Sequence, residues 1–160
     1  MTPASVGSQA NAVTSAPPCP GTGSCRYSAI ANDIVAVGYE GLPSGGTEFV
    51  TAVVDPVTGT PDAAFGGGMV SGFGGGLSTA EATGVAVYPP CPGASSCPWA
   101  DEAGDVVVVG TDPSGIQVAA YTPAGKLQWE AVVAPGPAGF AVGSCRRSHW
   151  TRRARRLTAT

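Results

Sequence analysis

Four of the five cysteines form two pairs whose spacing could support either of two kinds of chemistry. Cys19 and Cys25 flank a turn rich in proline and glycine, and Cys91 and Cys97 flank a similar turn further along the chain. A single metal site would need both pairs brought together, and the five intervening residues exceed the two to four that are typical of structural zinc knuckles. We therefore predict two local disulfides, which form in an oxidising compartment. Cys145 is then left over as a free thiol.

Other residues that could do chemistry are few. A serine or cysteine nucleophile needs a base, normally histidine, and the single histidine is His149, near the arginine-rich end. Asp101, Glu102 and Asp105 form the densest carboxylate group, but their spacing matches no calcium loop, so we expect a solvated hairpin turn. The sequence predicts no catalytic residue, no metal site and no cofactor, and therefore a protein that is not an enzyme.

Two glycine triplets and two tryptophans could contact a ligand. Gly66–Gly68 and Gly74–Gly76 are not followed by the Gly-Lys-Ser/Thr sequence or the helix of a phosphate-binding loop, so we interpret them as loop glycines. Trp99 and Trp129 could serve as stacking platforms. Their places beside Cys97 and at the end of an expected strand favour packing between sheets instead.

The composition favours many short strands. Hydrophobic residues make up 43% of the 160 residues, whereas charged residues make up only 12%, about half the usual share of roughly 25%. The 24 glycines and 15 prolines interrupt the chain every few residues, and valine and alanine dominate the apolar set. This pattern indicates strands rather than long helices. No apolar stretch approaches the roughly 20 residues of a membrane helix, so no membrane span is expected.

Charge is distributed unevenly. All 11 acidic residues lie between Asp33 and Glu130, whereas six of the eight basic residues lie at or after Arg146. Before that position only Arg26 and Lys126 are basic, so this part carries a net charge of −9. Such an acidic body argues against nucleic acid as a partner.

The sequence contains an internal repeat. Residues 11–38 align without gaps on residues 83–110, at an offset of 72, with 13 identities in 28 positions. The first copy has PPCPGTGSC followed by NDIVAVG, and the second has PPCPGASSC followed by GDVVVVG. EFVTAVVDPVTG and IQVAAYTPAGK then continue the alignment at an offset of 67, and each ends in a turn that contains proline and glycine. Repetition at a fixed period predicts serial units of one kind.

The expected strands are short, and the valine run 106–109 is apolar on both faces, which predicts a buried central strand. The strands are expected at 34–37, 49–54, 69–73, 84–88, 106–109, 118–121, 127–133 and 140–142. Four-stranded antiparallel units in series are typical of β-propellers, which close with 4–8 blades. We therefore predict an all-β fold, an incomplete, partial β-propeller-like array of about two units over residues 11–144. Such a chain would be a fragment or part of an oligomer.

The segment from Asn32 to Gly110 resembles the delta-60 repeat, a bacterial β-propeller-like module. The resemblance rests on DAAFGGG, which begins at Asp62, and on the later strand sequence DVVVVG. It implies a propeller-like architecture without shared catalytic residues, and structural roles for Asp62, Phe65, Gly66 and Gly110. The sequence GKLQW, which ends at Trp129, is similar instead to quinoprotein-type propeller repeats. The alternative that it implies is a fragment of a pyrroloquinoline quinone oxidoreductase.

The two ends of the chain differ from the repeat. The first residues have neither the basic start nor the apolar run of a secretion signal, so we expect residues 1–10 to be disordered and the true start to be missing. Residues 145–160 could form a nucleic-acid or membrane-surface arm. Because GFAV at 139–142 echoes GVAV at 84–87, we interpret this basic tail as disordered or as the product of a reading-frame shift.

These patterns favour a non-catalytic repeat module of the secreted or cell-surface kind, located outside the cell or in its envelope. Its role would be that of a scaffold or of a surface that binds a ligand or protein. Unpaired strand edges and an open sheet face would also promote self-association or docking of the missing blades of a longer parent.

Overall fold

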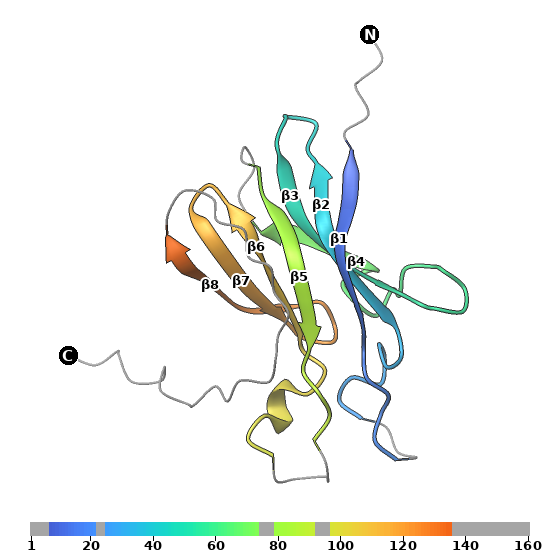
Figure 1. Cartoon of the computed structure of the whole chain (residues 1–160). Coiled ribbons are helices and arrows are strands. Elements are labelled where there is room, and N and C mark those ends of the chain that lie inside the picture. Colours follow the sequence, from blue (N-terminus) through green and yellow to red (C-terminus); the bar gives the residue numbers. More distant parts are fainter. Residues whose placement is uncertain (1–6, 22–24, 74–78, 92–96, 136–160) are drawn as a thin grey trace, which may run out of the picture.

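Runs of valine and alanine, separated by turns that contain glycine or proline, form eight strands in two antiparallel sheets (Figure 1). The computed structural model describes residues 7–21, 25–73, 79–91 and 97–135. The first sheet contains β1 (Ser8–Ser15), β2 (Ile34–Gly41), β3 (Thr47–Val54) and β4 (Met69–Phe73), in that order. The second contains β5 (Glu81–Val87), β6 (Val106–Asp112), β7 (Gly115–Tyr121) and β8 (Leu127–Pro135). The prediction of an all-β fold is confirmed, and neither sheet closes on itself.

β1 was not among the expected strands. It begins at Ser8, inside the segment 1–10 that the sequence predicts to be disordered, so that prediction is wrong for residues 8–10. Its sequence SQANAVTS has little apolar alternation, and β1 is held by pairing with β2, for example between Gln9 and Tyr39. The other expected strands are present, except that residues 140–142 lie outside the described residues.

A glycine opposes a pairing irregularity at the same place in both sheets. The register of β1 on β2 shifts beside Gly38, and the register of β5 on β6 shifts beside Gly110, 72 residues later. A Cβ atom on Gly38 would overlap the carbonyl oxygen of Gln9, and one on Gly110 would overlap that of Glu81. Both positions therefore require glycine because the backbones approach too closely for a side chain.

The hydrophobic core lies between the two sheets. β5 packs against β1, β2 and β3, and it lies beside β1 in the middle of the molecule (Figure 1). β6 is a central strand of its sheet, as predicted, with Val106 and Val108 buried and Val107 and Val109 half-buried. Across the sheets, the rings of Phe65 and Tyr121 meet edge to face with centroids 6.5 Å apart.

Each sheet has a loop between its first two strands that contains one cysteine pair. The Cα atoms of Cys19 and Cys25 are 5.6 Å apart, and those of Cys91 and Cys97 are 5.7 Å apart. Both pairs lie at disulfide distance, as predicted. Within the described part of the chain, no helix is long and apolar enough to cross a membrane.

Candidate functional site

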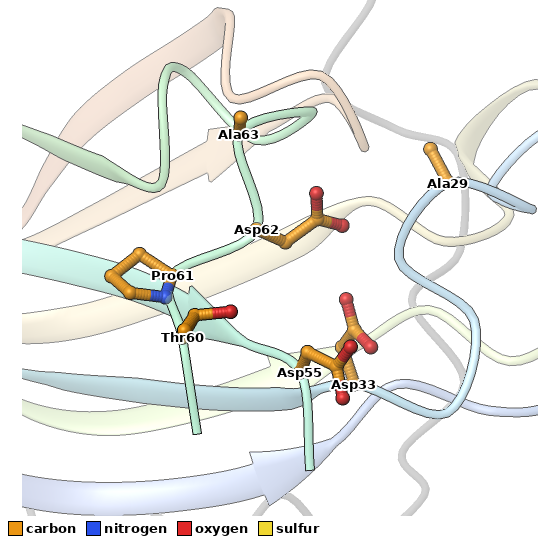
Figure 2. A pocket seen from close by; sticks show the side chains of 7 residues that line it. All are labelled: Ala29, Asp33, Asp55, Thr60, Pro61, Asp62 and Ala63. Carbon is orange, nitrogen blue, oxygen red and sulfur yellow. The ribbon is translucent and has the colours of Figure 1, made fainter. Parts of the chain in front are cut away.

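Three aspartates gather at one end of the first sheet (Figure 2). Asp33 directly precedes β2 and Asp55 directly follows β3, and the antiparallel pairing of Ile34 with Val54 brings these two ends together. Asp62 lies in the loop between β3 and β4. Together with Ala29, Thr60, Pro61 and Ala63, the three aspartates line an open hollow of about 260 Å³, which we call the acidic notch.

Backbone N–H groups fix two of these carboxylates. Oδ1 of Asp55 accepts hydrogen bonds from the N–H groups of Val57 and Thr58, at 2.7 and 3.2 Å. These donors hold the pKa of Asp55 below its ordinary value. Oδ1 of Asp62 accepts a hydrogen bond from the N–H of Ala64 at 2.9 Å. Both aspartates therefore order the loop from β3 to β4.

Asp33 differs from its neighbours in its affinity for a proton. Its pKa is raised from 3.8 to about 6, first by burial, then by a hydrogen bond with Asp62 and by the negative charges of Asp62 and Asp55. A carboxyl beside a second carboxylate retains its proton because the protonated form can donate to its neighbour. The pair Asp33–Asp62 therefore shares one proton at mildly acidic pH.

The notch has an acid–base pair but no partner for it. General acid–base catalysis needs a nucleophile or a reacting group within hydrogen-bond reach. The lining contributes only Ala29, Thr60, Pro61 and Ala63 besides the aspartates, and the hydroxyl of Thr60 lies 2.7 Å from that of Thr58. Among the described residues, no group of three or more histidine, cysteine or acidic side chains could hold a metal ion. The notch is suited to attracting a positively charged group rather than to catalysis.

The equivalent of Asp33 in the second sheet is Asp105, 72 residues later, and its environment is different. Asp105 is only 1% exposed. Its carboxylate accepts hydrogen bonds from Nη1 of Arg26 and Nε2 of Gln128, both at 2.5 Å. Arg26 also donates to the carbonyl oxygen of Ala103 at 2.8 Å. Arg26 thus crosses from the first unit into the second and neutralises the buried carboxylate there.

This contact corrects the interpretation of Asp101, Glu102 and Asp105 as a solvated hairpin turn. Asp101 is exposed and Glu102 is half-buried, at the 3-10 turn Ala100–Glu102, but Asp105 is buried. Burial raises the pKa of Asp105 despite the opposing effect of Arg26. The sequence offered one signal for this contact, since Arg26 is the only basic residue before Lys126 in an acidic chain. Gln128 gave none.

The Asp-Ala-Ala-Phe-Gly segment links the two sheets. Phe65 is fully buried, and the N–H of Gly66 donates to the carbonyl oxygen of Ala124 at 3.1 Å, in the turn between β7 and β8. A Cβ atom on Gly125 would lie 2.7 Å from the nitrogen of Gly66. The segment thus combines one acidic-notch residue, Asp62, with residues that hold the neighbouring sheet.

Both tryptophans differ from expectation. Trp99 is 37% exposed and Trp129 is 45% exposed, so neither is enclosed between the sheets. Trp129 lies beside Ala120 on the face of the second sheet that points away from the first, which is why the core does not cover it. Gly66–Gly68 are loop glycines with positive φ, as predicted. The second triplet, at 74–76, the basic tail, Cys145 and His149 lie outside the described residues.

Comparison with known proteins yields no relative. No protein-family model, no curated protein and no solved structure matches the chain.

Proposed function

We propose that the chain is a non-catalytic, β-propeller-like repeat module of the secreted or cell-surface kind, whose role is that of a scaffold or of a surface that binds a ligand or protein. The observation that carries the proposal is the recurrence of one loop. A cysteine pair with a sequence separation of 6 lies between the first and second strands of each sheet. Disulfides at equivalent places indicate a duplicated module that folds in an oxidising compartment.

The strand arrangement supports the propeller-like part of the proposal. Each sheet is an antiparallel meander of four strands in chain order, and the pairing of the first two strands shifts at positions 72 residues apart. Four-stranded meanders in series are what propeller blades are made of. The resemblance of the segment from Asn32 to Gly110 to the delta-60 repeat points to the same architecture.

The alternative of a quinoprotein fragment has no structural observation in its favour. Its motif residues Gly125 and Lys126 form the tight turn between β7 and β8, where the N–H of Thr122 donates to the carbonyl oxygen of Lys126 at 2.8 Å. Gly125 has a φ of +73°, which explains the glycine by turn geometry alone. The turn therefore needs no cofactor to account for its sequence.

The first experiment tests the oxidised module. The chain is produced in an oxidising compartment, and its intact mass is compared before and after reduction and alkylation. We expect two disulfides that link Cys19 to Cys25 and Cys91 to Cys97, assigned by peptide mapping. Four free thiols at these positions in folded protein purified from its native host would refute an oxidising location.

The second experiment tests binding. The oxidised chain is applied to arrays of polysaccharides and of cationic and neutral peptides. We expect a ligand whose binding weakens when Asp33 and Asp62 are both changed to Asn, because the acidic notch then loses its charge. The matched control is Asp101→Asn, which removes one charge at an exposed turn. Absence of any ligand for folded, oxidised protein would contradict a binding role and leave only the scaffold.

A further inference from the structure

The two sheets pack through faces that are not equivalent to each other. The face of the first sheet that meets the second, here called its inner face, consists of Val35, Val37, Phe49, Thr51 and Val53. The inner face of the second sheet consists of Val106, Val108, Gln117, Ala119 and Tyr121. All ten side chains are buried.

The offsets of the sequence repeat connect each inner face to the opposite side of the other sheet. Shifting the inner face of the first sheet by 72 residues from β2 to β6, and by 67 from β3 to β7, gives the outer face of the second sheet: Val107, Val109, Ile116, Val118 and Ala120. The reverse shift gives the outer face of the first sheet: Ile34, Ala36, Val50, Ala52 and Val54. The contact between the sheets is therefore head-to-tail, and each outer face is of the type that the other sheet already buries.

The outer faces are apolar, and the core cluster of the described residues includes none of their side chains. On the first sheet, Val13 is 68% exposed, Met69 46% and Ile34 36%. On the second, Trp129 is 45% exposed beside Ala120. Apolar surface of this kind marks an interaction site.

One detail of the internal contact identifies how the outer faces would fit. The ring of Phe49 lies directly over Gly110, where a Cβ atom would meet it. The equivalent of Gly110 on the outer face of the first sheet is Gly38, and a hollow of about 220 Å³ opens there. Ala36, Val50, Ala52 and Met69 also line this hollow. The equivalent of Phe49 is Ile116, on the outer face of the second sheet.

We propose that the outer face of the second sheet docks on the outer face of the first sheet of a second copy of this chain, with Ile116 in the hollow at Gly38. The occupant is a second copy because the same chain carries both halves of the contact, in the arrangement that it already uses internally. Heterologous contacts of this kind close into rings when the rotation allows it. Since propellers close with 4–8 four-stranded sheets, a ring would contain two to four copies.

One ion pair distinguishes the proposed contact from the internal one. Inside the chain, Arg26 of the first unit neutralises Asp105 of the second. In the contact between copies, the equivalent of Asp105 is Asp33, and the equivalent of Arg26 is Pro98, which carries no charge. The change Pro98→Arg would supply the missing guanidinium, so it should strengthen the assembly, whereas Pro98→Gln should not.

The test is the molar mass of the full chain by light scattering and sedimentation from low to high micromolar concentration. We expect a discrete species of two to four times 15.7 kDa. Ile116→Arg and Met69→Arg should each give the 15.7 kDa chain, because each variant lacks one half of the contact. Val57→Arg, at a loop position that is 90% exposed, should leave the mass unchanged.

Mixing provides the decisive arm. Ile116→Arg retains an intact first sheet and Met69→Arg an intact second sheet, so an equimolar mixture should form a one-to-one dimer that grows no further. Circular dichroism identifies any variant that fails to fold, and Trp129→Arg then replaces Ile116→Arg. A wild-type chain that stays monomeric at about 100 µM, variants that assemble as wild type does, or a mixture that stays monomeric would each overturn the proposal. None of these results depends on whether the module binds a ligand.

Discussion

Removing the guanidinium of Arg26 should destabilise the fold through a residue 79 positions away. Asp105 has a side chain that is 2% exposed, and Arg26, whose side chain is 34% exposed, supplies its positive charge. The change Arg26→Met retains most of the aliphatic stem and removes the charge and both hydrogen bonds. A buried carboxylate is then left with Gln128 as its remaining side-chain donor.

The magnitude follows from how far the pair is buried. Breaking a fully buried pair by removing one partner costs about 3–5 kcal/mol, because the remaining charge is left uncompensated. Water can approach Asp105 from the side of the partly exposed Arg26, and Gln128 still donates, so we expect about 2 kcal/mol. For a chain of this length, that corresponds to a fall in Tm of about 6 °C.

The pH dependence gives the loss a distinct signature. The folded-state pKa of Asp105 is already raised by burial, so the folded state binds its proton more readily than the unfolded chain does. Stability therefore decreases as pH rises through the folded-state pKa, and Arg26→Met should increase this slope because it raises that pKa further. The difference between variant and wild type should shrink as the pH is lowered to about 4.

Chemical denaturation of the oxidised chain, from pH 4 to pH 8, measures the effect. Asp105→Asn is the matched partner variant, since a neutral amide no longer needs a guanidinium. We expect the double variant to be more stable than Arg26→Met alone at neutral pH, with a coupling free energy of about 1–2 kcal/mol. The reasoning is refuted if Arg26→Met costs the same at pH 4 and pH 8, or if the two substitutions are additive.

Three further predictions concern single residues. Gly110→Ala should destabilise the fold by about 1–3 kcal/mol in urea titrations, because its methyl group would overlap the carbonyl oxygen of Glu81 and the ring of Phe49; wild-type stability would disprove the close approach. Phe65→Ala should cost about 3–5 kcal/mol because the ring is fully buried, whereas Val57→Ala, the exposed control, should change stability by less than about 0.5 kcal/mol. Asp33→Asn should flatten the loss of Tm as pH rises from 4 to 7, because the pKa of Asp33 lies at about 6 in the folded state and 3.8 otherwise; an unchanged profile would show that another group titrates.

The sequence predicts those parts of the fold that depend on local patterns. Val106 to Val109 are apolar at every position, so a central strand was the natural inference, and β6 is central. The loops around the cysteine pairs could also be inferred, because six residues of separation and a turn between them favour a local bond over a distant one. Both inferences use information within a few residues of each other.

The parts that were missed depend on contacts between distant segments. β1 lacks an apolar pattern and becomes a strand because β2 offers a paired edge, although the offset of 72 from β5 was available as a signal. Asp105 is buried because Arg26 reaches it from the other unit. Trp129 is half exposed because its face of β8 points away from the core. None of these outcomes is written in the residue's own neighbourhood.

Asp33 and Asp105 show what this means for inferring function from a repeat. Both precede the second strand of their sheet at equivalent positions, but only Asp105 has a guanidinium beside it, and Asp33 instead faces two other carboxylates. The difference comes from the preceding unit, which contributes Arg26 to Asp105 and has no described counterpart for Asp33. A residue of a serial repeat therefore acquires its charge environment from the neighbouring unit rather than from its own. It follows that the chemistry of the acidic notch depends on what docks beside the first sheet, and that position 98, where proline replaces arginine, decides whether a second copy could neutralise it.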